Sequence, residues 1–263
     1  LTLRRLPDDT LEIIGTVPRD SAPVYQAASV QNPTVFFLRS LRQTLETRGV
    51  DVLGGAIELD EVTEPVPSNE LRVLATHQSP PLSDIAANLM GISQNLYAEM
   101  LLHALDQRRQ PRTAKSGRNV ILEVLESWGI NPSRIIVADG SGLSRYNYLT
   151  ARTLVDILQR MHNDPRHAAP FLATLPVAGF SGTLKNRLVG TAAAGKVHAK
   201  TGSMSNVRAL SGYVTREGGD RLAFAAIANN FPGPGEPIVS VIDQLIIRLV
   251  SSSRSDSRSD GGL

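Results

Sequence analysis

The 263-residue sequence contains no cysteine and no long apolar run. The absence of cysteine excludes disulfides and thiolate metal ligands, and it suits an exported bacterial protein as well as a cytosolic one. The longest purely apolar run near the C-terminus, Leu222 to Ala228, is far shorter than the roughly 20 residues that span a bilayer. The sequence therefore predicts no transmembrane segment, and it leaves peripheral contact with a membrane surface open.

Three further signals are missing. The chain begins at Leu1 without Met and shows no signal-peptide pattern, so we expect either a trimmed precursor or a fragment. No Gly-x-Ser-x-Gly elbow occurs, which argues against a Ser-His-Asp hydrolase built on Ser144 and His198. Ser-x-x-Lys is absent as well, because the nearest spacing, Ser181 to Lys185, is one residue too long.

The charge balance excludes a strongly basic or acidic protein. The formal net charge is +2, and Lys and Arg alternate with Asp and Glu, so no nucleic-acid-binding stripe is predicted. The five His residues show no metal-ligand spacing, and we expect neither a metal nor a cofactor. With 41% hydrophobic residues, the chain can bury one sizeable core or two smaller ones.

Local patterns divide the chain into three parts. Residues 1–66 form a small α/β piece, in which Asn32-Pro33 predicts the start of a helix. The polar, proline-containing stretch Glu61–Asn69 interrupts all regular patterns and predicts a domain boundary near residue 66. Residues 67–250 are the main domain, and the polar tail 251–263 is expected to be disordered.

The main domain changes its pattern from helical to extended along the chain. Apolar spacing predicts helices throughout 81–162, and alternation predicts strands at 196–200, 209–216 and 221–229. An amphipathic helix is predicted at 237–250. The fold class is therefore α/β (α+β), with an antiparallel sheet and a cluster of helices.

Two short motifs lie at the ends of predicted elements. Lys200-Thr201-Gly202, followed by Ser203, ends the first strand, where an ammonium, hydroxyls and N–H groups can bind a carboxylate. By composition, a chance Lys-Thr-Gly has a probability of about 5%. Ser93-Gln94-Asn95 follows a helix that we expect to be capped by Ser83 and to end at Gly91. Alone, Ser93 can equally be read as the N-cap of the next helix.

Taken together, the two motifs match two of the three motifs of penicillin-recognising enzymes. Over nearly its whole length the chain resembles the low-molecular-mass class C penicillin-binding proteins, the D-Ala-D-Ala carboxypeptidase and endopeptidase family. Other matching stretches are Asn32-Pro33, Leu96 through Glu99, Asp139 to Arg145, Gly182-Thr183-Leu184, and Leu210 to Tyr213. In that family the Ser-x-x-Lys serine lies near the N-terminus, before inserted domains.

The resemblance implies a β-lactamase/transpeptidase-like fold. Residues 1–66 would be the C-terminal end of an inserted domain, and residues 67–250 a transpeptidase-like domain without its N-terminal part. The nucleophile of an acyl-serine mechanism would then lie outside this chain. The chain alone is expected to be inactive.

The resemblance also assigns roles to individual residues. Ser93 would relay a proton to the leaving D-Ala, Lys200 would assist this relay and attract the substrate carboxylate, and Asn95 would hold an amide carbonyl of the substrate. The hydroxyls of Thr201 and Ser203, on either side of Gly202, would bind the same carboxylate.

A second set of residues would determine substrate choice. Leu143, Arg145 and Met204 would line the pocket for a stem-peptide side chain, and Arg145 is equally well explained as a surface salt bridge. The expected ligands are peptidoglycan peptides and β-lactams, and the expected location is periplasmic or otherwise extracytoplasmic. A serine β-lactamase and a non-catalytic peptidoglycan-binding fragment remain alternatives.

Overall fold

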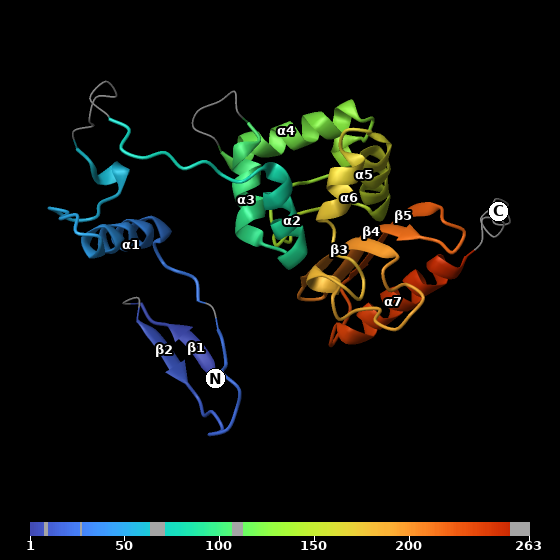
Figure 1. Cartoon of the computed structure of the whole chain (residues 1–263), viewed down its shortest axis with the longest axis horizontal. Helices are drawn as coiled ribbons and strands as arrows, with labels where there is room; N and C mark the ends of the chain where they lie inside the picture. Colours follow the sequence, from blue (N-terminus) through green and yellow to red (C-terminus); the bar gives the residue numbers. More distant parts are fainter. Residues whose placement is uncertain (8–9, 27, 64–71, 107–112, 253–263) are drawn as a thin grey trace. The chain divides into compact units, whose positions relative to one another are not determined.

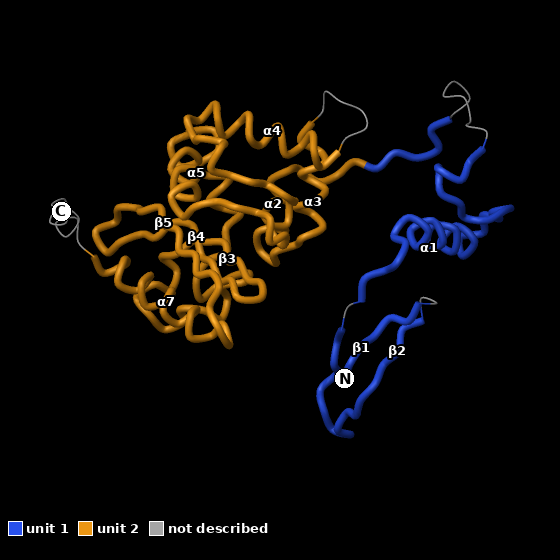
Figure 2. Tube along the Cα trace, turned by 180° about the vertical axis from the view of Figure 1, so that it is seen from behind, with its two compact units in different colours: residues 1–77 blue, residues 78–263 orange. Residues whose placement is uncertain are grey.

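A computed structural model of the chain describes residues 1–7, 10–26, 28–63, 72–106 and 113–252. These residues form two compact units, Leu1–His77 and Gln78–Leu263 (Figure 2). Most of the predicted domain crossing Glu61–Asn69 and most of the predicted disordered tail 251–263 lie outside the described residues. The division after His77 falls in an exposed segment without regular structure, somewhat beyond the boundary predicted near residue 66.

Unit 1 contains a hairpin of β1 (Thr2–Arg5) and β2 (Leu11–Ile14), the helix α1 (Pro33–Thr47) and a short 3-10 turn, η1 (Leu59–Glu61). The helix starts as predicted, because Asn32 Oδ1 accepts a hydrogen bond from the Val35 N–H at 2.9 Å. No residue of α1 is buried.

The N-terminal part of unit 2 is helical, in agreement with the sequence pattern. Its first helix begins at Leu82 with Pro81 as N-cap, so Ser83 lies inside the helix and the predicted capping role was wrong. The helix also continues through Gly91 to Ile92. The helices are α2 (Leu82–Ile92), α3 (Asn95–Ala104), α4 (Ala114–Ser127), α5 (Ala151–Asn163) and α6 (Ala168–Thr174).

The C-terminal part of unit 2 is an antiparallel sheet followed by a helix (Figure 1). The strands β3 (Val197–Met204), β4 (Val207–Thr215) and β5 (Arg221–Asn229) pair in the order β3-β4-β5. The helix α7 (Glu236–Ser251) follows. The predicted meander and the predicted last helix are both confirmed.

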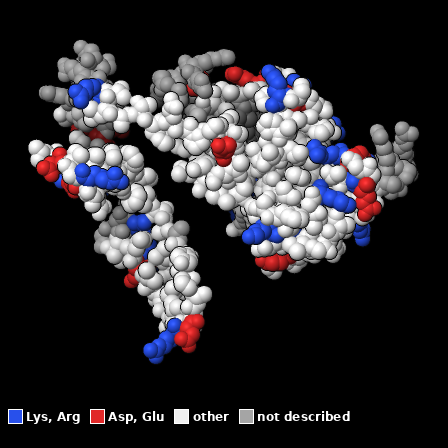
Figure 3. All heavy atoms as spheres, in the orientation of Figure 1, with Lys and Arg blue, Asp and Glu red and all other residues white. Residues whose placement is uncertain are grey.

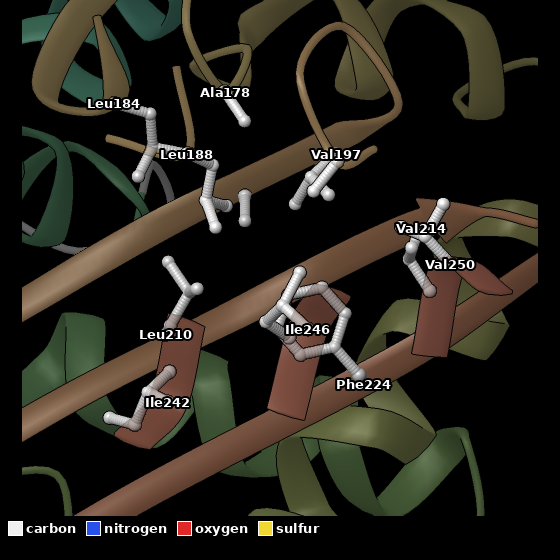
Figure 4. Packing of buried hydrophobic residues seen from close by; sticks show 12 residues of the cluster. Ala178, Leu184, Leu188, Val197, Leu210, Val214, Phe224, Ile242, Ile246 and Val250 are labelled. Carbon is white, nitrogen blue, oxygen red and sulfur yellow. The ribbon is translucent and has the colours of Figure 1, made fainter. Parts of the chain in front are cut away.

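The core lies on both faces of β4. Figure 4 shows Ile242, Ile246 and Val250 of α7 packed against the side chains of Leu210, Val214 and Phe224 from the sheet. On the opposite face, Tyr213 packs beside Leu158 of α5 and donates a hydrogen bond to its carbonyl at 2.7 Å. The sheet is thus fixed between α7 and α5, and β3 is held through its pairing with β4.

The packing of α7 gives a direct test of this core. Ile246 is 1% exposed whereas its neighbour Leu245 is 49% exposed. Ile246→Ala is therefore expected to lower the free energy of unfolding by about 2–5 kcal/mol, and Leu245→Ala by less than about 1 kcal/mol. Urea denaturation of both variants measures this difference. Equal losses would contradict the packing of α7.

The surface carries charges of both signs. On the face of unit 2 shown in Figure 3, Lys and Arg are interspersed with Asp and Glu. Within the described part of the chain, no helix has the length and apolar character needed to cross a membrane.

Candidate active site

The turn between α2 and α3 presents Ser93 in an unusual backbone conformation. Ser93 has φ 60° and ψ 53°, the left-handed region, and it forms the C-cap of α2, while Gln94 is the N-cap of α3. The interpretation of Ser93 as an ordinary N-cap was therefore wrong. A left-handed conformation costs a residue other than glycine about 1–2 kcal/mol. Such residues concentrate at functional sites.

Lys200 of β3 reaches this turn. Its Nζ donates hydrogen bonds to Ser93 Oγ at 2.7 Å and to the Thr201 carbonyl at 2.6 Å. The two motifs thus meet directly, as the resemblance implied. Burial lowers the pKa of Lys200 below its ordinary value, because the charged form loses solvation.

The Lys200 side chain is expected to titrate below the ordinary lysine value of 10.5. As the pH rises, it will lose its positive charge before exposed lysines do, and its hydrogen bond to Ser93 will no longer be assisted by that charge. NMR titration of ¹³C-labelled lysine side chains measures this pKa, and Lys200→Ala assigns the signal. A Lys200 signal that titrates with the exposed lysines would contradict the burial of this ammonium.

The outer edge of β3 is partly paired and partly open. The Ala199 N–H bonds to the Pro176 carbonyl at 2.9 Å, so the odd-numbered residues of β3 direct their backbone groups away from β4. The same alternation directs the Ser203 N–H outward. Thr201 lies between them, and its hydroxyl donates a hydrogen bond to Thr183 Oγ1 at 2.9 Å.

The loop 139–145 is fixed to the first turns of α3. The Glu99 carboxylate accepts the N–H groups of Gly140 at 3.1 Å and Ser141 at 3.0 Å. Burial acts to raise the pKa of Glu99, but hydrogen bonds from Ser141 and Gly140 outweigh it and lower the pKa below its ordinary value. Asp139 closes the loop as a turn, since its carboxylate accepts the N–H of Ser144 at 2.6 Å. No separate signal in the sequence pointed to Glu99, although this residue lies in a matching stretch.

The remaining predicted residues surround this centre. A guanidinium nitrogen of Arg145 donates to the Ser205 carbonyl at 3.2 Å, beside Met204 at the end of β3. Leu143 is 51% exposed, and Asn95 is exposed at the first position of α3. Within the described part of the chain, no hydrogen bond joins Asn95 or Leu143 to Lys200.

The site combines a serine turn between two helices with a lysine on an antiparallel sheet, and a C-terminal helix packs on that sheet. This is the arrangement of the β-lactamase/transpeptidase-like folds. A TLA-3 extended-spectrum β-lactamase shares this fold, with a TM-score of 0.50 and 17% identity. The model of the D-Ala-D-Ala carboxypeptidase 3 (S13) family matches residues 3–246, and the chain belongs to this family.

Individual relatives agree with this assignment. A D-alanyl-D-alanine carboxypeptidase of Actinomadura sp. (strain R39) is 39% identical over 252 residues, which are 94% of this chain and 46% of the relative. Penicillin-sensitive carboxypeptidase A of Dictyostelium discoideum is 33% identical over 84% of this chain and 43% of its own length. The crystal structure of penicillin-binding protein 4 from Haemophilus influenzae matches with a TM-score of 0.80 and 25% identity, over 95% of this chain and 56% of that structure. The chain spans about half the length of the curated relatives it matches.

Proposed function

We propose that this chain supplies the proton-relay and substrate-binding part of a serine-type D-Ala-D-Ala carboxypeptidase that acts on peptidoglycan stem peptides. The observation that carries the proposal is the 2.7 Å hydrogen bond between Lys200 Nζ and Ser93 Oγ. The chain contains no Ser-x-x-Lys, so the nucleophilic serine and its lysine base come from polypeptide outside these 263 residues. We call this chain joined to that nucleophile-bearing part the assembled enzyme.

In the assembled enzyme, the serine Oγ attacks the carbonyl of the terminal D-Ala-D-Ala bond, and the motif lysine takes its proton. When the C–N bond breaks, Ser93 gives its proton to the amine of the leaving D-Ala and takes up the proton that the motif lysine holds. Because Lys200 donates to Ser93 Oγ, the Ser93 O–H is free to point towards the leaving group. Water then hydrolyses the acyl-serine.

The edge of β3 binds the terminal carboxylate of the substrate. The Lys200 ammonium and the hydroxyls of Thr201 and Ser203 provide charge-assisted hydrogen bonds to it. The Ser203 N–H, which the strand alternation directs outward, is one donor of the oxyanion hole. The amide of Asn95, at the start of α3, holds a carbonyl of the penultimate part of the peptide.

The loop 139–145 and the end of β3 bind the side chain of the stem peptide. Leu143 and Met204 provide the apolar wall. Arg145 uses one nitrogen for the Ser205 carbonyl, and its guanidinium has further donors for a free carboxylate of a diaminopimelate-type residue. The alternative explanation, a surface salt bridge, finds no support among the described residues, in which Arg145 forms no ion pair.

The names of the relatives support the substrate class. The Actinomadura relative is a D-alanyl-D-alanine carboxypeptidase, and the Haemophilus protein has been crystallised in complex with a β-lactam. By this analogy the assembled enzyme also binds β-lactams and works outside the cytoplasm on the cell wall, without a cofactor. Residues 1–66 are the end of an inserted domain and residues 67–250 the transpeptidase-like domain.

The proposal is tested with the assembled enzyme, either native or as a chimera in which this chain replaces the matching part of the Actinomadura relative. We expect release of D-Ala from a stem-peptide analogue and a long-lived covalent adduct with penicillin. Fast turnover of penicillin would instead identify a β-lactamase. Binding of peptidoglycan without an adduct and without D-Ala release would identify a non-catalytic module.

A further inference from the structure

The short turn η4 (Gly182–Leu184) touches the element that carries Ser93. Gly182 has φ +53°, and a Cβ added to it would lie 2.5 Å from the carbonyl oxygen of Gly91. Real Cβ atoms do not approach a backbone oxygen so closely, so only glycine permits this contact. The turn therefore rests directly on the last turn of α2, two residues before Ser93.

The same turn touches the strand that carries Lys200. Thr183 Oγ1 and Thr201 Oγ1 are 2.9 Å apart and hydrogen bonded. The next residue, Leu184, is 0% exposed and belongs to the cluster that contains Val197 and Ala199 of β3. Since Leu184 is held by this core, Thr183 meets Thr201 from a fixed position.

We infer that η4 is a brace that sets the spacing between the Ser93 turn and β3, and that Thr183 is a positioning residue for the hydroxyl of Thr201. The inference rests on the proposed function, in which Thr201 binds the substrate carboxylate. Thr183 acts through Thr201 and does not itself touch the substrate. Gly182 acts through the backbone of α2.

The chemistry of two hydroxyls explains how Thr183 acts. Without ligand, Thr201 donates its hydrogen to Thr183. Each hydroxyl has one hydrogen and two acceptor lone pairs, and the hydrogen rotates to suit its surroundings. When a carboxylate arrives, Thr183 donates to Thr201, and Thr201 donates to the carboxylate. A chain of hydrogen bonds that points towards an anion strengthens each of its members.

Thr183→Val in the assembled enzyme removes this donor while it keeps a side chain of similar shape. We expect the second-order rate of acylation by penicillin to fall about fivefold, the value of one hydrogen bond between two neutral hydroxyls. Thr183→Ser should restore the rate to within about twofold. The methyl ester of the same penicillin lacks the carboxylate, so Thr183→Val should change its acylation rate less than about twofold. The unfolding temperature should stay unchanged.

A double mutant separates positioning from general damage. If Thr183 acts through Thr201, then Thr183→Val combined with Thr201→Val is no slower than Thr201→Val alone. Three outcomes would each overturn this inference and leave the proposed function intact. They are additive losses of acylation rate in the double mutant, equal losses for the penicillin and its methyl ester, and a Thr183→Val variant that is as fast as the wild type. If the wild-type assembled enzyme forms no penicillin adduct, or if Lys200→Ala leaves its acylation rate unchanged, the proposed function is overturned and the inference with it.

Gly182 has a matched control in the same segment. Gly190 also has a positive φ, +70°, but a Cβ there would meet no atom within 4 Å. Both alanine variants carry the backbone strain, and only Gly182→Ala presses on Gly91. Gly182→Ala is expected to slow acylation by about tenfold or more for acid and ester alike, and Gly190→Ala by less than about twofold. Equal rates for the two variants, each shown by thermal unfolding to be folded, would overturn the role of the brace.

Discussion

Lys200→Ala in the assembled enzyme is expected to slow acylation by about 100-fold or more. The substitution removes a partly buried ammonium that donates to Ser93 and faces the predicted site of the substrate carboxylate. Both interactions are stronger in a desolvated site than at the surface. Lys196, which precedes β3 and forms no ion pair among the described residues, is the matched control.

The acylation rates are measured by stopped-flow with a fluorescent penicillin, and thermal unfolding shows that each variant is folded. Lys196→Ala should remain within about threefold of the wild type, as is usual for a solvated charge. If Lys200→Ala were also within threefold, Lys200 would be an ordinary strand residue. The assignment of the site would then have to be abandoned.

The 263-residue chain by itself is expected to form no covalent penicillin adduct and to release no D-Ala. It contains no Ser-x-x-Lys serine, and the partner of Ser93 is an ammonium that donates a hydrogen bond and so does not accept the Ser93 proton. Nucleophilic serines need an adjacent base. In the proposed mechanism Ser93 therefore acts as a proton relay and not as the nucleophile.

Intact mass measurement after incubation with penicillin tests this expectation, with the assembled enzyme as the positive control. A stoichiometric adduct on the chain alone would show that the nucleophile has been misplaced. Ser93→Ala and Ser181→Ala variants would then show which serine carries it. Ser181 is the less expected of the two, because its Oγ accepts the Val177 N–H at 2.9 Å.

The sheet and its helix could be predicted because their signals are local. Alternating apolar residues and the Glu217–Asp220 turn define β4 and β5, and the periodicity of 237–250 defines α7. For α3, the pattern of apolar residues does not indicate which side of the helix is buried. The helical spacing of Leu96 and Met100 is typical of a buried side, but these side chains are 62% and 53% exposed. The helix instead buries Leu102, against the close approach of Gly117 from α4, a contact that no local pattern reveals.

The contacts within the candidate site were likewise not predictable from local sequence patterns. The meeting of Ser93 and Lys200 could be expected only through the resemblance, since 107 residues separate them. The left-handed backbone conformation of Ser93 could not be predicted from the sequence, because a serine before a helix normally predicts an N-cap. The contact of Thr183 with Thr201 depends on where the core places Leu184. Spacing along the chain carries no information on such contacts.

The order β3-β4-β5 leaves β5 at the edge of the sheet in the described part of the chain. This strand is nine residues long, and Arg221 at its start is its only charged residue. Long apolar edges that carry no central charge pair readily with strands of other molecules. Concentrated solutions of the chain alone should therefore self-associate through β5, and size-exclusion chromatography over a series of chain concentrations would show this as a shift to larger species.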